Sequence, residues 1–122
     1  MSELRPRWRL VDGDTVALGP GKADLLEAIA GEGSLAGAAR RLGMSYMRAW
    51  TLLGTMNRAF GRPLVELERG GSRHGAALLT PLGREILDLY RDLERESLAA
   101  TAKLRRRLAA RLSRSPAARR RR

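Results

Sequence analysis

The stretch Gly33–Phe60, which reads GSLAGAARRLGMSYMRAWTLLGTMNRAF, decides the fold. It predicts a short helix over residues 35–42, a tight turn at Gly43 and Met44, and a second helix that opens at Ser45. Glycine ends a helix at little cost in the left-handed conformation, and serine is a good N-cap. Two helices joined in this way form a helix-turn-helix. A plain corner between two core helices is the alternative, and the segments around this stretch have to distinguish it from a DNA-binding motif.

The composition of the whole chain excludes several classes of protein. It has 122 residues, no cysteine and one histidine, which excludes disulfides and thiolate metal sites. We therefore expect no metal and no cofactor. No apolar run is long enough to span a bilayer and no signal-peptide pattern is present. The expectation is a cytoplasmic, nucleoid-associated protein without a membrane partner.

The net charge of +11 is concentrated in two segments. Residues 34–80 carry seven basic groups and two acidic ones, a net charge of +5. Residues 103–122 carry ten basic groups and no acidic one. Either segment could meet the phosphates of a nucleic acid. We expect the Arg-rich tail over 113–122 to be disordered.

The remaining patterns predict a mainly α fold with small β hairpins, in which a winged helix-turn-helix precedes a long C-terminal helix. Alternating apolar residues around a turn indicate an N-terminal hairpin, and a second hairpin placed after the helix-turn-helix is a wing. Thr80 is the expected cap of the last helix, with proline in its first turn. The predicted segments are a DNA-binding domain over 1–80 (hairpin 7–18, helix-turn-helix 34–60, wing 64–80), a dimerisation helix over 81–112 and the tail.

The length of the last helix suggests a partner. About thirty helical residues extend about 45 Å, more than a small winged domain can cover. Apolar side chains recur along it at intervals of three, four and seven residues, which favours pairing of two such helices in a homodimer. A helix that frays beyond about Leu98 is the alternative. The predicted dimerisation residues are Leu82, Ile86, Leu89, Leu93, Ala100 and Leu104.

The second helix of the helix-turn-helix should bury one face and present the other to DNA. Its core positions at helical spacing are Ala49, Leu52, Leu53, Met56 and Phe60. On the other side, the guanidinium of Arg48 matches the O6 and N7 acceptors of guanine, and Met47 could pack on a thymine methyl. Trp50 should be partly buried. The predicted DNA-binding residues are Ser34, Ser45, Tyr46, Met47, Arg48, Trp50, Thr51 and Arg58, with Arg69, Ser72, Arg73 and His74 at the wing tip.

These motifs resemble the N-terminal domain of ModE-type molybdate-responsive regulators and, more distantly, LysR-type regulators. The resemblance rests on the Ser-Tyr-Met-Arg-Ala-Trp run at 45–50 and on the Leu-Thr-Pro-Leu-Gly step at 79–83. It implies a winged helix-turn-helix that binds operator DNA as a dimer, with DNA-facing roles for Ser45, Tyr46, Arg48 and Trp50. Position 47 is methionine where such regulators tend to have a basic residue. No oxyanion-binding domain follows the long helix, so no molybdate binding is expected from this chain.

These observations favour a homodimeric, sequence-specific DNA-binding transcriptional regulator. Its recognition helix, 45–60, would enter the major groove, and the wing, 69–75, would lie on the backbone or in the minor groove. The alternative is a nucleoid- or RNA-associated architectural protein that binds mainly through its basic tail. No constellation of catalytic residues is visible, so an enzyme is not expected.

Overall fold

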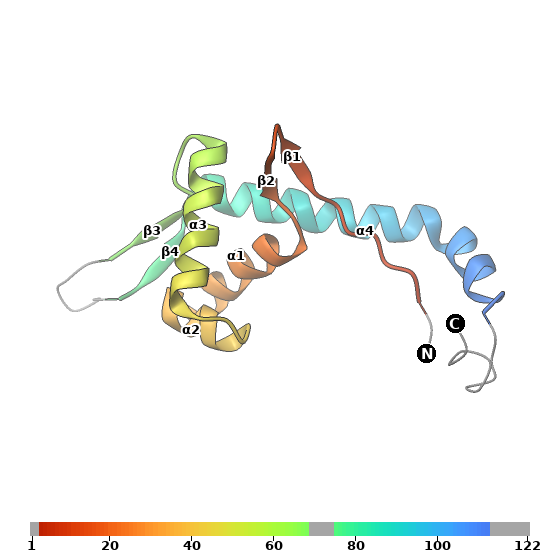
Figure 1. Ribbon diagram of the computed structural model, residues 1–122, viewed down its shortest axis with the longest axis horizontal. Coiled ribbons are helices and arrows are strands. Elements are labelled where there is room, and N and C mark those ends of the chain that lie inside the picture. Colours follow the sequence, from red (N-terminus) through yellow and green to blue (C-terminus); the bar gives the residue numbers. More distant parts are fainter. Residues whose placement is uncertain (1–2, 69–74, 113–122) are drawn as a thin grey trace. The chain divides into compact units, whose positions relative to one another are not determined.

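The computed structural model describes residues 3–68 and 75–112 (Figure 1). These residues form four helices and two antiparallel hairpins, which confirms the predicted fold class. The elements are β1 (Leu10–Asp12), β2 (Thr15–Leu18), α1 (Pro20–Glu32), α2 (Leu35–Arg41), α3 (Tyr46–Phe60), β3 (Val65–Leu67), β4 (Ala77–Leu79) and α4 (Pro81–Ala109).

The described residues form two compact units. The first comprises Arg7–Asp92 and holds both hairpins, the first three helices and the start of α4. The second comprises residues 3–6 and 93–112, the N-terminal segment and the rest of α4.

The core of the first unit is built around α1, which packs against both α2 and α3. Large apolar side chains from successive elements meet there without access to water. Burying each of them stabilises the fold by roughly 1.5–3 kcal/mol before conformational entropy is counted. The largest fully buried side chains are Leu25, Leu26, Ile29, Leu35, Met56 and Leu64.

Two serine caps and one glycine set the geometry of the helix-turn-helix. The Ser34 hydroxyl accepts the N–H of Gly37 at 3.0 Å and caps α2. The Ser45 hydroxyl accepts the N–H of Arg48 at 3.0 Å and caps α3. Between the two helices, Gly43 has φ 69°, the left-handed conformation that glycine adopts most cheaply. The predicted turn and cap are therefore confirmed.

The wing strands are joined to the helix-turn-helix by the backbone. β3 pairs with β4 so that Val65 lies opposite Leu79 and Leu67 opposite Ala77. The N–H of Ala77 also donates to the carbonyl of Gly33 at 2.8 Å. An isolated bridge between Ser34 and Ala76 continues this contact. The base of the wing is thus fixed at the start of α2, and the hairpin projects away from the helices (Figure 1).

The first turns of α4 belong to the core of the first unit. Gly83, Ile86, Leu87 and Tyr90 form its buried face. Ile86 is 8% exposed, so its side chain has no surface to offer a partner chain. Leu82 packs against the same core. The structure thus places these two predicted dimerisation residues against the core of the first unit, a position that the spacing of apolar residues alone does not reveal, since α4 has two apolar faces.

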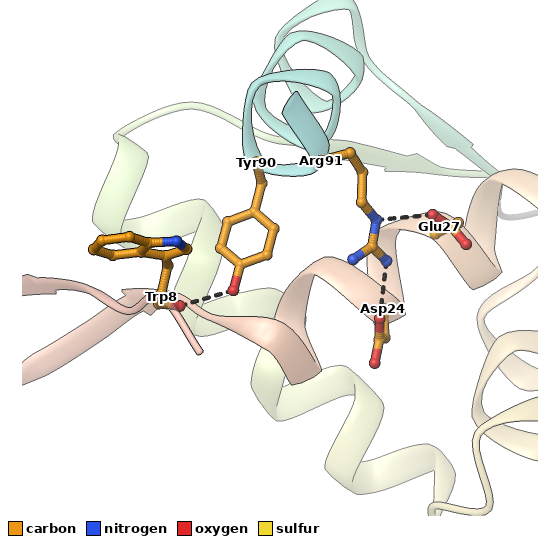
Figure 2. Close-up of polar contacts among 5 residues, drawn as sticks. All are labelled: Trp8, Asp24, Glu27, Tyr90 and Arg91. Carbon is orange, nitrogen blue, oxygen red and sulfur yellow. Dashed lines mark hydrogen bonds and ion pairs between the residues drawn. The ribbon is translucent and has the colours of Figure 1, made fainter. Parts of the chain in front are cut away.

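Polar contacts attach α4 to α1 and to the segment before β1 (Figure 2). The hydroxyl of Tyr90 donates to the carbonyl of Trp8 at 2.7 Å. The guanidinium of the next residue, Arg91, reaches two carboxylates of α1: Nε lies 2.9 Å from Oε1 of Glu27, and Nη2 lies 2.8 Å from Oδ1 of Asp24. Because the two carboxylates lie one turn apart, one side chain fixes the position of α4 along α1.

In the second unit, Arg105 connects α4 to the N-terminal segment. Its guanidinium donates to the carbonyl of Leu98 at 2.6 Å and to the Thr101 hydroxyl at 3.0 Å, both on α4. A third nitrogen lies 3.5 Å from the carbonyl of Leu4. The outer leucines of this part of α4 remain exposed, and Leu104 is 61% exposed.

Candidate nucleic-acid interface

Helix α3 presents a polar outer face opposite the core. Ala49, Leu53 and Met56 are buried. At about 100° per residue, Thr51 and Arg58 point away from that buried face, and both are exposed. The structure thus brings these two predicted site residues onto one surface of α3, where a duplex could approach.

Two hydroxyl groups near the start of α3 already have backbone partners. The Ser45 oxygen accepts the N–H of Arg48, so its own hydrogen stays available to a phosphate oxygen. The Thr51 hydroxyl donates to the carbonyl of Met47 at 2.9 Å, so its lone pairs stay available as acceptors. Ser45 is thereby suited to an anion and Thr51 to a donor on a base edge.

The exposed apolar side chains of α3 form an open groove with the base of the wing. Met47 is 65% exposed, Tyr46 50% and Trp50 40%. Trp50, which was expected to be partly buried, thus keeps two fifths of its surface exposed on the side of the groove. The groove has a volume of about 310 Å³ and is lined by Tyr46, Met47, Trp50, Leu67, Glu68, Gly75 and Ala76.

Four residues of this groove were not among the predicted site residues: Leu67, Glu68, Gly75 and Ala76. They come from the base of the wing, whereas sequence reasoning had looked only at the basic tip. The alternation in β3 and β4 was visible in the sequence. However, the side of α3 on which the hairpin packs depends on the contacts of Ala76 and Ala77 with the start of α2.

Arg48 lies on a flank of α3 rather than at the centre of its outer face. Burial in the first place, and the positive charge of Arg48 in the second, lower the pKa of Lys22 below its ordinary value. Lys22 stands in the first turn of α1, which packs against α3. Two cations from different helices thus act on one another at this edge. Sequence reasoning missed Lys22, because only the packing of α1 on α3 brings the two together.

Ser34 and the wing tip complete the predicted set. Ser34 caps α2 and its backbone pairs with Ala76, which places it next to the wing base. The other predicted wing residues, Arg69, Ser72, Arg73 and His74, lie outside the described residues.

The segment that contains the helix-turn-helix is positively charged. Between Gly33 and Val65 the chain has five arginines and no acidic residue.

Within residues 3–68 and 75–112, no three His, Asp or Glu side chains lie close enough to hold a metal ion. No helix in the described part of the chain is long and apolar enough to cross a membrane.

Sequence comparison shows that this chain matches a known family. The family described as bacterial regulatory helix-turn-helix protein, lysR family, matches residues 22–84. The molybdenum-pterin-binding protein MopA of Rhodobacter capsulatus is 46% identical over 70 residues, which make up 57% of this chain and 26% of MopA. The molybdenum transport protein ModE of Azotobacter vinelandii is 42% identical over 92 residues, 75% of this chain and 34% of ModE. The chain thus spans about a quarter to a third of the length of these relatives.

Solved structures show the same arrangement of helices and wing. The DNA-binding domain of CbnR, solved in complex with DNA, is 27% identical with a TM-score of 0.57, and the match covers 75% of this chain and 97% of that domain. Full-length LysG from Corynebacterium glutamicum is 28% identical with a TM-score of 0.56, over 75% of this chain and 30% of LysG.

Proposed function

The chain belongs to the lysR family of bacterial regulatory helix-turn-helix proteins, and we propose that it is a transcriptional regulator that binds specific sequences of double-stranded DNA. The observation that carries this proposal is the outer face of α3, where Met47, Thr51 and Arg58 stand exposed on a helix capped and backed by a rigid core. A helix presented in this way enters the major groove, where every base pair has a distinct pattern of donors and acceptors.

Some side chains of this surface would contact bases, and others would contact the DNA backbone. Thr51 and Arg58 face base edges, and Met47 offers an apolar contact. The Ser45 hydroxyl, the Ser34 cap and the cations Lys22 and Arg48 would meet phosphates on the flanks. Arg48 was expected to read guanine. Its place beside Lys22 instead favours the backbone, since two neighbouring cations with no acidic partner among the described residues suit a phosphate between them.

We propose that the protein acts as a homodimer through α4, with the wing tip at 69–75 on the DNA backbone or in the minor groove. The exposed leucines along α4 support the dimer. Leu89 belongs to the first unit, and Leu93, Leu104 and Leu108 belong to the second. Large exposed apolar side chains at helical spacing favour a partner helix. Such a regulator would act in the cytoplasm, on the nucleoid.

Selection of duplexes from a random library with the full chain tests the function. We expect enrichment of a palindromic motif whose half-sites lie one or two helical turns apart. A variant that lacks 113–122 should enrich the same motif. Equal affinity for every duplex would refute sequence-specific binding. If that variant binds no nucleic acid, the result would instead support an architectural protein that binds mainly through its basic tail.

A further inference from the structure

The groove between α3 and the wing base lies outside the proposed contacts of Thr51, Arg58 and the flanking cations with DNA. Tyr46, Met47 and Trp50 of α3 line one side, and Leu67, Glu68, Gly75 and Ala76 of the wing base line the other. It opens beside the outer face of α3, because Met47 belongs to both. A duplex that touches Thr51 and Arg58 would therefore also be close to this groove.

Charge and polarity restrict which part of DNA could enter. Glu68 repels phosphate oxygens, so the groove is unsuited to the DNA backbone. Against the apolar side chains of Met47, Leu67 and Ala76, polar base edges would lose hydrogen bonds to water. In the major groove only one group is apolar, the 5-methyl group of thymine.

We propose that this groove is a thymine-reading site, in which Met47 and the ring of Trp50 pack against the 5-methyl group of one thymine in each half-site. The inference rests on the proposed function and adds a base preference to it. Three large side chains of α3, Tyr46, Met47 and Trp50, are exposed at the groove, and an apolar group of the DNA would cover them. The wing base contributes the opposite wall, so the reading site needs the α3–wing arrangement as well as the helix.

Replacement of thymine by deoxyuridine in the selected duplex tests the proposal with the unaltered protein. Deoxyuridine keeps the base pair and removes only the methyl group. At one or two positions in each half-site we expect the affinity to fall about fourfold, the factor that burial of one such group contributes. At the other thymines the affinity should not change. A duplex in which every thymine tolerates deoxyuridine would overturn the inference, and the proposed function would still stand.

Variants of position 47 connect the effect to the groove. Met47→Ala should bring the thymine-to-deoxyuridine ratio at the sensitive position close to one, whereas Met47→Leu should keep it. Leu78→Ala is the matched control, since Leu78 is 43% exposed on β4 and does not line the groove. A fourfold ratio that survives Met47→Ala would overturn the site. Selection that enriches no motif would refute the proposed function itself and this inference with it.

Discussion

Gly83 and Leu64 approach one another more closely than any other residue type at position 83 would permit. A Cβ built on Gly83 would lie 2.0 Å from the carbonyl oxygen of Leu64, a backbone atom that cannot turn aside. The first turn of α4 therefore crosses directly over the exit from α3. The wing lies between these two segments in the chain, so this crossing helps to fix where the wing begins and ends.

We expect Gly83→Ala to destabilise the fold by about 3 kcal/mol or more, because the backbone itself must move to admit the methyl group. Urea denaturation followed by circular dichroism measures this difference. Gly21→Ala is the control: Gly21 lies in α1 and no atom stands within 4 Å of an added Cβ. That change should stabilise the protein by up to about 1 kcal/mol. Similar effects of the two changes would contradict the close approach.

The hydroxyl of Thr80 joins the same two segments. It donates to the carbonyl of Pro63 at 2.8 Å and accepts the N–H of Gly83 at 3.0 Å. Thr80→Val keeps the shape but leaves both backbone groups without this partner, so we expect a loss of about 2 kcal/mol in the free energy of unfolding. Thr80→Ser keeps the hydroxyl and should lose much less. Equal stability of the two variants in urea denaturation would show that the hydroxyl contributes nothing.

Stability should depend on pH through Lys22. Its pKa in the folded protein lies below its ordinary value of 10.5, because burial and then the charge of Arg48 disfavour the ammonium form. At neutral pH the charged lysine therefore costs stability, and the cost disappears as pH rises through the folded pKa towards 10.5. Lys22→Gln should raise the melting temperature at pH 7 and lose this advantage in alkaline solution.

Two further measurements separate the causes of that shift. Arg48→Gln removes the second cause and should recover part of the gain in melting temperature. Lys103→Gln, an exposed change on α4, should have no such pH profile. An advantage of Lys22→Gln that is constant with pH would contradict the shifted pKa.

Lys22→Gln should also lower the affinity for all duplexes alike and reduce the salt dependence of binding by about one unit of slope.

Dimer formation should depend on the exposed leucines of α4. Leu104→Glu places a charge where the partner helix would pack, so we expect sedimentation to show monomers at concentrations at which the parent chain is dimeric. Affinity for a palindromic duplex should fall with it. Ala99→Glu, at an exposed position on another side of α4, is the control and should leave the dimer intact. A parent chain that is monomeric at all concentrations would refute the homodimer.

Local signals in the sequence were sufficient for the helix-turn-helix and its caps. Gly43 and Ser45 act through their own backbone and the next turn, so a short window contains all that decides their conformation. Thr80 and Pro81 predict the start of α4 because a cap and a proline in the first turn also act locally. These elements could be predicted because their causes are close in sequence.

The features that could not be predicted depend on contacts between distant segments. Ile86 and Leu89 are both apolar and belong to one helix, yet only the packing of α4 on the core of the first unit decides that Ile86 is buried. Lys22 enters the candidate interface because α1 packs on α3. The positions of Leu67 and Ala76 in the groove likewise depend on the pairing of the wing base with the start of α2.

Backbone hydrogen bonds close the base of the wing next to β3 and β4. The N–H of Glu68 donates to the carbonyl of Ala76 at 2.8 Å, and the N–H of Gly75 donates to the carbonyl of Glu68 at 3.1 Å. These bonds complete the strand pairing before the chain reaches the residues between them. Doubling a loop costs only about 0.6 kcal/mol in closure entropy. We therefore expect insertions between Glu68 and Gly75 to leave the folded core of the first unit unchanged.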